Sequence, residues 1–495
     1  MQSIKSKSLA SLLAGIVLVD PEKDTNIHGL KLDSRCVTVG DLFIAYPGDQ
    51  VDGRDFIEQA VRSGAKAILA EEDSNYTWPS LAPEVVLYKV QDLRHKISQV
   101  AARFYDNPSR KMHLTGITGT NGKTSIAYLL SCALDQITKN SCVYFGTLGV
   151  GFPHKLEEST HTTLDAISLQ HYLADFSEEG VTHGMLEVSS HALDQGRVEN
   201  IEFETALFTN LTRDHLDYHK TMEAYGEAKK KLFKQFGLKS AVINWDDTFG
   251  FELYTSLPDA IFKMGYSLNN PDADIYADQI RLMDNGGMRA NIQTPWGEGI
   301  LETPLIGRFN LYNILAIVGV LGLSYPLEQV LDCIKALPHV PGRMECVSGK
   351  PYFIVDYAHT PDALENVLIT SKELLHLKTG KLWCVLGCGG DRDKGKRPLM
   401  GKIAEQWADH VIITNDNPRT ENPMSIAEDI LEGIKDKKAV SIILDREKAI
   451  HYAFEQAKKN DIILVAGKGH ECYQIIGKEK HFFSDVAVCK KMALV

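Results

Sequence analysis

A glycine-rich loop between a strand and a helix constrains the fold of this chain more than any other feature. Residues 112–118 form a short strand-like run, residues 119–124 read Gly-Thr-Asn-Gly-Lys-Thr, and an apolar helical stretch follows. A strand, glycine loop and helix in this order occur where a parallel sheet binds phosphate at the carboxyl ends of its strands. The sequence therefore predicts a nucleotide-binding α/β domain built around the loop.

The loop is a variant of the common phosphate-loop pattern, because five residues rather than four separate Gly116 from Gly122. Its backbone N–H groups can still converge on phosphate oxygens, Lys123 can neutralise the outer phosphates, and the Thr124 hydroxyl can ligate magnesium. The alternative is a glycine turn without a ligand, which the Gly-Lys-Thr ending and the helix disfavour. We expect nucleotide contacts at Gly119, Thr120, Asn121, Gly122, Lys123, Thr124 and Ser125.

The chain has 495 residues, too many for one hydrophobic core, and we expect three α/β domains at residues 1–105, 106–340 and 341–495. A helix at residues 9–19 should open the first, small domain. Strand patterns in the central domain predict a parallel sheet around the phosphate loop, and those in the last domain predict a second doubly wound, Rossmann-like sheet. The central strands are expected at residues 112–118, 184–188, 206–209 and 241–244, and the last at 353–357, 382–387, 411–414, 442–444 and 462–466.

Charge and composition exclude several classes of protein. With 65 acidic against 53 basic residues, the net charge is -12 and no basic stripe is present, so nucleic acid is not an expected partner. The nine cysteines are scattered singly, which is typical of reduced thiols and not of a disulfide framework or zinc site. No apolar run is long enough to cross a membrane. We therefore predict a cytoplasmic protein.

Polar residues gather at two further strand ends of the central sheet. Residues 187–191 read Glu-Val-Ser-Ser-His, and residues 209–219 contain Asp214, His215, Asp217 and His219. Because ligands of such sheets bind at the carboxyl ends of the strands, these carboxylates and imidazoles suit a divalent-cation site beside the phosphate loop.

Together with residues 307–310 (Gly-Arg-Phe-Asn), these motifs resemble the Mur ligase family of peptidoglycan synthesis, and the resemblance extends over nearly the whole chain. It implies that Thr124 and Glu187 hold one magnesium ion, and that Glu187, His215 and a carbamylated Lys229 hold a second. It also implies a catalytic set of Lys123, Glu187, His215 and Lys229. From spacing alone, Lys229 is better explained as a solvated helix lysine.

The nucleotide should also meet residues outside the loop. By the same resemblance Asn310 would face the adenine nucleotide. We add Arg343 and Asp356, which lie where the last domain begins and at the end of its first strand. For Asp356, the start of a capped helix is an equally good explanation.

Three motifs of the last domain each follow an expected strand, so they can converge on one pocket. Arg392 and Arg419 offer planar forks for a carboxylate, and Glu471 can receive an ammonium group, which fits a zwitterionic amino acid. The resemblance marks Arg419 as the residue that selects meso-2,6-diaminopimelate over lysine. The predicted pocket residues are Arg392, Asp416, Asn417, Pro418, Arg419, Gly467 and Glu471.

The remaining substrate contacts are implied by resemblance. Segments of the first domain should hold the uridine end of UDP-N-acetylmuramoyl-L-alanyl-D-glutamate, and segments of the central domain should hold its sugar and peptide. The expected residues are Leu32, Ser34, Asp49, Gln50 and Val51 in the first domain, and Thr162, Thr163, Ser189, Gln195 and Arg197 in the central one. For Thr162 and Thr163, a strand-end or helix-capping role is the alternative.

The function predicted from these motifs is an ATP-dependent ligase that acts as a monomer and activates the substrate carboxylate as an acyl phosphate, which the amine of diaminopimelate then attacks. A folylpolyglutamate synthetase shares the expected ATPase architecture, but we would not expect in it the uridine-binding domain or the Arg392 and Arg419 motifs. A nucleotide-gated switch is the rival from another class, and the extra metal and zwitterion clusters count against it.

Overall fold

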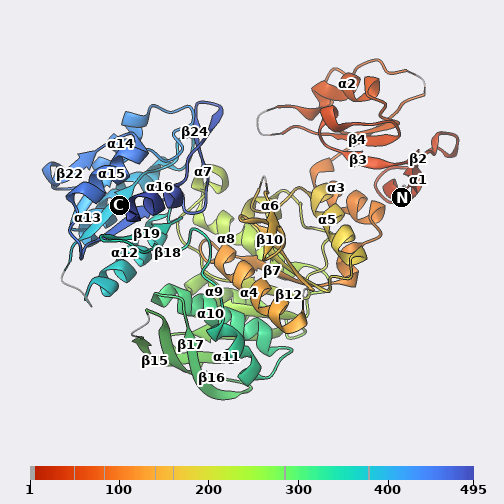
Figure 1. Cartoon of the computed structure of the whole chain (residues 1–495). Helices are drawn as coiled ribbons and strands as arrows, with labels where there is room; N and C mark the ends of the chain where they lie inside the picture. The colour runs from red at the N-terminus through yellow and green to blue at the C-terminus, as the bar shows by residue number, and fades with distance from the viewer. Residues whose placement is uncertain are drawn as a thin grey trace.

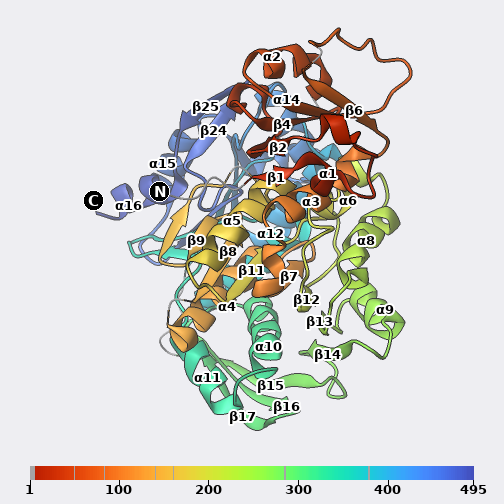
Figure 2. The same cartoon turned by 90° about the vertical axis from the view of Figure 1, so that its right-hand side faces the viewer.

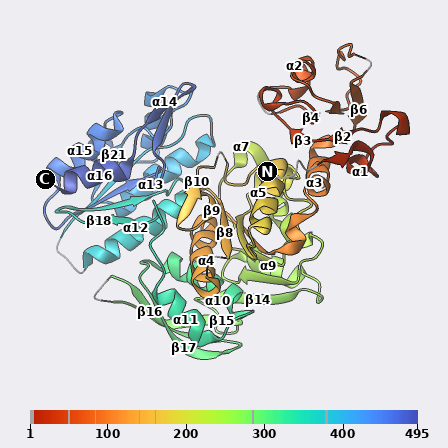
Figure 3. The same ribbon diagram turned by 45° about the vertical axis from the view of Figure 1, so that its right-hand side comes forward.

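The computed structural model describes residues 6–48, 51–82, 84–139, 141–159, 161–283, 286–376 and 380–494. These residues form three main sheets that follow one another along the chain. The first and the last unit stand on opposite sides of the central one (Figure 1), and a view turned by 45° shows the same separation (Figure 3). The expected three-part α/β architecture is confirmed.

The first unit is a parallel sheet in the order β3-β4-β5-β6. Its core packs α1 and α3 on one face and α2 on the other. The helix expected at residues 9–19 is wrong in length: it ends at Leu13, because the chain turns at Gly15 with a φ of 71°. The elements are β1 (Lys7–Ser8), α1 (Leu9–Leu13), β2 (Asn26–Ile27), β3 (Gly29–Lys31), β4 (Asp41–Ala45), α2 (Ile57–Arg62), β5 (Ala67–Glu71), β6 (Val86–Val90) and α3 (Leu93–Phe104).

The central sheet has the order β10-β9-β8-β11-β7-β12-β13-β14-β15-β16-β17. The strands from β8 to β15 run parallel, and β7 lies between β11 and β12. Its strands are β7 (His113–Thr118), β8 (Cys142–Gly146), β9 (Gly149–Phe152), β10 (Lys155–Glu157), β11 (His183–Glu187), β12 (Thr205–Phe208), β13 (Ser240–Asn244), β14 (Phe262–Ser267), β15 (Ile275–Leu282), β16 (Met288–Thr294) and β17 (Gly297–Thr303). The strands predicted for this domain are confirmed, and the two antiparallel edges were not predicted.

Helices cover both faces of the parallel part, which explains why its inner strands β8, β11, β7, β12 and β13 are buried along nearly their whole length. One face packs against α4, α10 and α11, and the other against α5 and α9. Strands β15 to β17 and helix α11 form the base of the unit (Figure 2). The helices are α4 (Lys123–Thr138), α5 (Ala166–Glu178), α6 (Ser190–Asp194), α7 (Leu216–His219), α8 (Met222–Lys230), α9 (Thr248–Ser256), α10 (Arg308–Gly322) and α11 (Leu327–Lys335).

The last unit is a six-stranded sheet over its described residues, in the order β18-β19-β23-β20-β21-β22. All neighbours are parallel except β18, which pairs antiparallel with β19. A separate hairpin joins β24 and β25. The strands are β18 (Glu345–Val347), β19 (Tyr352–Asp356), β20 (Leu382–Leu386), β21 (His410–Ile413), β22 (Val440–Ile442), β23 (Ile462–Ala466), β24 (Tyr473–Ile476) and β25 (Glu479–Phe482).

This sheet is also covered on both faces, by α12, α13 and α14 on one and by α15 and α16 on the other. The predicted Rossmann-like layering is thus observed, and the predicted strands agree except that β22 begins two residues earlier than expected and ends at Ile442. The helices are α12 (Pro361–His376), α13 (Arg397–Trp407), α14 (Pro423–Leu431), α15 (Arg446–Gln456) and α16 (Asp485–Ala493). In the part of the chain that is described, no helix has both the length and the apolar character of a membrane span.

Candidate active site

The phosphate loop leaves β7 and enters α4 with two glycines at positive φ, 144° for Gly119 and 88° for Gly122. Residues with side chains rarely adopt such values. A Cβ on Gly119 would overlap the Thr209 hydroxyl, and one on Gly122 would lie 2.7 Å from the Asn313 side-chain oxygen. The loop therefore packs directly against the end of β12 and the first turns of α10, and both glycines are required by that packing.

The residues that follow β12 hold the phosphate loop in place through hydrogen bonds. Thr120 N donates to Asn210 O over 2.8 Å, and Asn121 N donates to Asn210 Oδ1 over 2.9 Å. The Thr209 hydroxyl donates to Asn121 O over 2.6 Å. Because these bonds join protein groups alone, the loop holds its shape without a ligand, as a preorganised phosphate site requires.

Lys123 and Thr124 open α4 where the sequence predicted them. Lys123 Nζ donates to the loop carbonyls of Gly119 and Thr120, at 2.9 and 2.8 Å, so its charge stays at the loop. The Thr124 hydroxyl donates to Glu187 Oε2 over 2.8 Å. Ser125 is buried in the same first turn of α4. Thr124 and Glu187, which were expected to hold one magnesium ion, are therefore adjacent.

Glu187 is a buried carboxylate at the end of β11, with 1% of its surface exposed. Its oxygens accept hydrogen bonds from the Thr124 and Tyr144 hydroxyls, and from Thr147 N over 2.8 Å and Thr147 Oγ1 over 3.3 Å. Thr147 lies in the turn between β8 and β9, and the sequence analysis missed it because that hairpin was not predicted. The carboxylate is thus fixed in direction beside the phosphate loop.

Lys229 and His215 lie on the other side of the loop. Lys229 is 1% exposed in α8, and its Nζ donates to Gly119 O over 2.7 Å. Burial, reinforced by the charge of Lys123, holds the pKa of Lys229 well below its ordinary value. Burial also lowers the pKa of His215 to about 3. The His215 imidazole is therefore neutral near pH 7. Because Lys229 is buried, its interpretation as a solvated surface lysine is wrong.

These residues fit magnesium in part. Over the residues that the structure describes, no group of three or more His, Cys, Asp or Glu side chains is arranged to hold a metal ion. The adjacent Thr124 hydroxyl and Glu187 carboxylate are oxygen donors of the kind that magnesium prefers. A neutral Lys229 amine is a poor ligand for so hard a cation, whereas its carbamate would add an anionic oxygen.

Asn310, which was expected at the nucleotide, lies close to the phosphate loop and bonds to other residues of the protein. In the first turn of α10, Asn310 donates to Ile306 O over 2.7 Å, and Asn313 donates to Asn310 Oδ1 over 3.1 Å. Asn313, which packs on Gly122, was not predicted. Its signal was present in the sequence, because an asparagine three residues after Asn310 shares its helix face.

Arg343 and Asp356 form a unit at the start of the last domain. Arg343 Nη2 donates to Thr124 Oγ1 over 3.2 Å, so it reaches the phosphate loop. The Asp356 carboxylate accepts from the backbone N–H groups of Met344 and Ala358, each over 2.7 Å. The cap of α12 is Thr360, since its hydroxyl accepts from Ala363 N. Asp356 therefore holds the turn that carries Arg343.

Further bonds join the last domain to the phosphate region. Asn121 Nδ2 donates to Asp362 Oδ2 over 2.8 Å. Asp214, which follows β12, lies 3.6 Å from Lys396 Nζ and 3.6 Å from His359 Nε2 of the last domain. Both Asp214 and Lys396 are buried. The loop that carries Arg392 is therefore anchored beside the nucleotide site.

The residues expected around the sugar and peptide also come together. Arg197 Nη1 donates to Thr163 O over 2.9 Å, and its other nitrogens donate to Gln195 Oε1. The Thr163 hydroxyl donates to Glu187 O over 2.8 Å. The first and central units enclose a cavity of about 170 Å³ here, lined by Leu32, Tyr46, Arg94, Ile97, His161, Asp165, Ala166, Gln195 and Arg197.

Thr162 and Ser189 make local bonds at the rim of this region. The Thr147 hydroxyl donates to Thr162 Oγ1 over 3.1 Å. The Ser189 hydroxyl caps α6 by accepting from Ala192 N. The strand-end role weighed for Thr163 thus agrees with its bond to Glu187, without excluding a substrate contact.

The residues of the first domain that were expected to bind the uridine end differ in their surroundings. Leu32 lines the cavity, whereas the Ser34 hydroxyl is buried and donates to Gln59 Oε1 over 3.0 Å. Val51 is 64% exposed. Asp49 and Gln50 lie outside the described residues.

Two guanidinium groups meet at the end of β20. Arg419 has a φ of 50° and donates to Gly390 O over 2.8 Å, and Arg392 donates to Asp391 O over 3.0 Å. Burial and the neighbouring charge of Arg392 lower the pKa of Arg419. No carboxylate of the described residues forms an ion pair with either arginine. Two such unpaired cations side by side favour an anionic ligand.

The loops after β21 and β23 complete the pocket. Asn417 Nδ2 donates to Glu471 Oε2 over 3.1 Å, and the fully buried Lys468 donates to both, at 3.1 Å to Asn417 Oδ1 and 2.8 Å to Glu471 Oε2. Gly467, at a φ of 118°, would bring a Cβ within 2.6 Å of Asp416 Oδ2. The predicted convergence of Arg392, residues 416–419 including Pro418, Gly467 and Glu471 is confirmed, and Lys468 is an addition.

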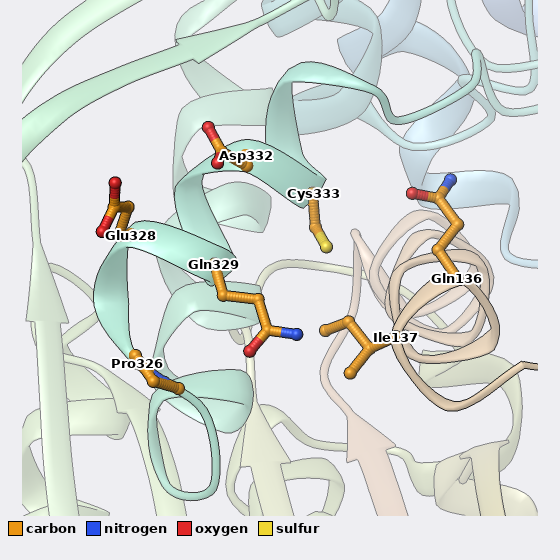
Figure 4. Close-up of a pocket in the computed structure, with 7 residues that line it drawn as sticks. All are labelled: Gln136, Ile137, Pro326, Glu328, Gln329, Asp332 and Cys333. Carbon is orange, nitrogen blue, oxygen red and sulfur yellow. The ribbon is translucent and has the colours of Figure 1, made fainter.

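A larger hollow elsewhere is unrelated to this chemistry. It opens between the end of α4 and helix α11 (Figure 4) and is lined by Gln136, Ile137, Pro326, Glu328, Gln329, Asp332 and Cys333. The phosphate loop lies at the start of α4, and this helix of 16 residues spans roughly 24 Å. The hollow at the end of the helix is therefore far from the phosphate loop. None of its residues was predicted to bind substrate.

Comparison with known proteins agrees with this geometry. Models of the Mur ligase family, catalytic domain, the Mur ligase middle domain, and the Mur ligase, glutamate ligase domain, match residues 26–105, 117–321 and 342–469. A UDP-N-acetylmuramoyl-L-alanyl-D-glutamate--2,6-diaminopimelate ligase of Coxiella burnetii is 48% identical, over 94% of this chain and 96% of its own. The ligase of the same name from Neisseria meningitidis is also 48% identical, over 93% of each chain.

Among solved structures, a ligase of that name superposes with a TM-score of 0.68 at 36% identity and covers 99% of each chain. The family models together span all three domains, in the order in which the structure arranges them. With the phosphate loop, the buried carboxylate and the third-domain pocket in place, this chain belongs to the Mur ligase family.

Proposed function

We propose that this chain is an ATP-dependent ligase that adds meso-2,6-diaminopimelate to UDP-N-acetylmuramoyl-L-alanyl-D-glutamate. Relatives 48% identical over more than nine tenths of the chain carry the name of this activity. The observation that carries the proposal is the pair of unpaired guanidiniums, Arg392 and Arg419, opposite the Asn417 and Glu471 side chains. A site of this charge pattern suits an amino-acid end, with its carboxylate on the arginines and its ammonium at Glu471.

The same pattern favours diaminopimelate over lysine. Both molecules present a distal ammonium group, but only diaminopimelate has a distal carboxylate. Without that carboxylate, the charge of the half-buried Arg419 would remain unmatched, and the exposed Arg392 beside it would have no anion to bind. We therefore assign the distal end of diaminopimelate to this pocket, which leaves its other amine free to react.

At the other end of the site, ATP would lie along the phosphate loop. The backbone N–H groups of the loop and Lys123 offset phosphate charge, and Arg343 adds a second cation beside Thr124. Asn310 and Asn313 border the loop on the adenine side. Magnesium, held through Thr124 and Glu187, would neutralise charge on the transferred phosphoryl group. The acceptor carboxylate attacks the γ-phosphorus, and the bond to the bridging oxygen breaks so that ADP leaves. The amine then attacks the acyl carbon, loses a proton and displaces phosphate.

We further propose that Lys229 is carbamylated in the active enzyme. Carbon dioxide reacts only with a neutral amine, and the pKa of Lys229 is held well below its ordinary value by burial. The carbamate would give an oxygen ligand next to His215, for a second magnesium ion. Carbon-13 NMR of protein equilibrated with labelled bicarbonate should give a carbamate signal that the Lys229→Ala variant lacks. A spectrum unchanged by that substitution would refute carbamylation.

The UDP-sugar substrate would span the first and central units. The cavity at Leu32, Gln195 and Arg197 is its proposed position, with Thr162, Thr163 and Ser189 toward the reacting carboxylate. Ser34, Asp49, Gln50 and Val51 stay predicted contacts. A monomeric state and a cytoplasmic location are likewise parts of the proposal.

Phosphate release in the presence of ATP, magnesium and the UDP-muramoyl dipeptide tests the proposal. Three reactions are compared, with diaminopimelate, with lysine and without an amino acid. We expect fast release only with diaminopimelate, and a product whose mass equals that of the tripeptide adduct. Equal rates in all three would defeat the ligase proposal, and a faster reaction with lysine would defeat the choice of amino acid alone.

A further inference from the structure

The last domain contains a fully buried ion pair beneath the amino-acid pocket. Arg446, the first residue of α15, and Asp485, the first residue of α16, both have side chains with 0% exposure. Arg446 Nε and Nη2 donate to the two Asp485 oxygens, each over 2.8 Å. Neither residue was singled out from the sequence, because they lie 39 positions apart.

The position of Arg446 is unfavourable for a purely structural residue. The first turn of a helix carries partial positive charge, which repels a cation. Burying an ion pair costs several kcal/mol of desolvation, and well-packed apolar residues often serve stability equally well. A buried guanidinium at a helix start therefore calls for an explanation beyond its bond to Asp485.

The two remaining bonds of Arg446 supply that explanation. Nη1 donates to Asn415 O over 3.1 Å, and Nη2 donates to Ala466 O over 2.9 Å. Asn415 directly precedes the residues 416–419 motif, and Ala466 directly precedes Gly467. The two carbonyls belong to the ends of β21 and β23, which are separated in the sheet by β20. The guanidinium therefore bridges across the end of β20 and links the starts of two substrate loops.

The charge of Arg446 reaches the same loops. Burial alone would lower its pKa, but Asp485, and after it Asp416 and Glu471, raise the pKa above its ordinary value. The charge of the Arg446 guanidinium therefore lies near both loops, in agreement with its bonds to the Asn415 and Ala466 carbonyls.

We propose that Arg446, oriented by Asp485, is a positioning residue for the amino-acid substrate, because it fixes the distance between the loop of Asn417 and the loop of Glu471. This inference rests on the proposed function of the pocket. A guanidinium suits the task because its planar fork can serve three acceptors at once, whereas a lysine ammonium is a single point. Neither residue touches the substrate.

The test compares Arg446→Lys and Asp485→Asn with a control at the other end of β23. Asp461 is equally buried, accepts bonds from Trp383 Nε1 over 3.0 Å and from Lys381 N over 2.9 Å, and precedes β23. It lies five residues from Ala466, roughly 16 Å along the strand. Asp461→Asn should therefore destabilise the same domain without altering the pocket loops.

The measured quantities are the KM values for diaminopimelate, ATP and the UDP-muramoyl dipeptide, with the melting temperature of each variant. For Arg446→Lys and Asp485→Asn, we expect the KM for diaminopimelate to rise about tenfold, the effect of one or two lost charged hydrogen bonds, with the other two KM values within about twofold of wild type. Asp461→Asn should lower the melting temperature comparably and leave all three KM values unchanged.

Each other outcome has a defined meaning. An unchanged KM for diaminopimelate in both pair variants, or a parallel rise for all three substrates, would overturn the inference. Failure of both pair variants to fold where Asp461→Asn folds would also overturn it, because the pair would then be structural. Absence of turnover with diaminopimelate in the wild type would defeat the proposed function itself, and the inference with it.

Discussion

At the phosphate loop, the Glu187 carboxylate is surrounded by hydroxyl and backbone donors, and the two lysines donate to loop carbonyls. In the third-domain pocket, two arginines lie side by side, and no carboxylate of the described residues forms an ion pair with either. Glu187 accepts four protein hydrogen bonds, and burial holds the pKa of Lys229 well below its ordinary value. Arg392 and Arg419 instead donate to carbonyl groups of their own loops. The first region surrounds a buried anion with donors, and the second brings two cations together.

This difference agrees with the two tasks. Phosphoryl transfer depends on fixed groups that offset charge in the transition state, so their geometry must exist beforehand. Selection of an amino acid depends on how costly it is to leave the pocket charges unmatched by the wrong ligand. Substitutions at the loop should therefore lower kcat, while substitutions in the pocket should raise the KM for one substrate.

The largest effect is expected for Lys229→Ala. Loss of the proposed carbamate and of the bond to the Gly119 carbonyl should lower kcat by at least about a thousandfold, as removal of a catalytic electrostatic group does. Lys230→Ala is the matched control, because Lys230 is next in α8 and partly exposed. Steady-state phosphate release measures both. A kcat for Lys229→Ala near that of Lys230→Ala would contradict the assigned role.

A stability effect is expected beside the amino-acid pocket. Hydrogen bonds from the buried Arg397 lower the pKa of Glu421 to about 2, from an ordinary value of 4.5. Because the folded pKa is the lower one, the pair stabilises the fold above pH 4.5, and this contribution is lost as the pH falls toward 2. It amounts to roughly 3 kcal/mol, about a hundredfold in the folding equilibrium.

Urea unfolding of wild type and Glu421→Gln measures this contribution. The difference in unfolding free energy between the two proteins should be largest at pH 7 and should shrink steadily below pH 4.5. A difference that is constant with pH would mean that the ionised Glu421 carboxylate contributes nothing through its pairing.

A smaller change should follow Arg419→Lys. An ammonium cannot reproduce the two-pronged contact of a guanidinium with a carboxylate, so the KM for diaminopimelate should rise about thirtyfold. The KM values for ATP and the UDP-muramoyl dipeptide should not change. Lysine turnover is the internal control, since lysine lacks the distal carboxylate. If Arg419→Lys impaired the reactions of diaminopimelate and lysine equally, Arg419 would not determine which amino acid is selected.

The smallest change is expected for Thr147→Val, which keeps the shape of the side chain and removes its hydroxyl. The Glu187 carboxylate would lose one of its four bonds and Thr162 would lose a partner, so kcat should fall about fivefold. The KM for diaminopimelate should stay constant. Thr138→Val, at the far end of α4, is the control. If Thr147→Val changed the KM for diaminopimelate and left kcat unchanged, the claim that substitutions near the phosphate loop act on kcat would be contradicted.

Local patterns predicted the strand, the glycine loop and the helix that follows it. Gly119, Gly122, Lys123 and Thr124 are consecutive or nearly so, and the strand and helix that flank them are strongly apolar. The convergence of Arg392, Asn417 and Glu471 was also foreseeable, because each motif follows a strand of one parallel sheet. Strand order alone places such motifs at the same edge.

The groups that support these residues were not foreseeable from the sequence. Thr147 lies in the turn of an antiparallel hairpin, and Arg446 is a single cation outside every motif. Lys468 lies within a predicted motif, between Gly467 and Glu471, but was given no role. Their roles depend on burial and on partners in other elements, which a linear pattern does not encode. The short first helix was missed for a related reason, since Gly15 stops it despite a continuing apolar run.

The claim that both regions serve one reaction is tested most directly by an isotope transfer. The dipeptide substrate is labelled with oxygen-18 in its terminal carboxylate and is incubated with ATP, magnesium and diaminopimelate. If the carboxylate attacks the γ-phosphorus and the amine then displaces phosphate, each phosphate released should carry one labelled oxygen and the new amide should retain the other. Unlabelled phosphate would show that the loop only hydrolyses ATP, and would contradict the account.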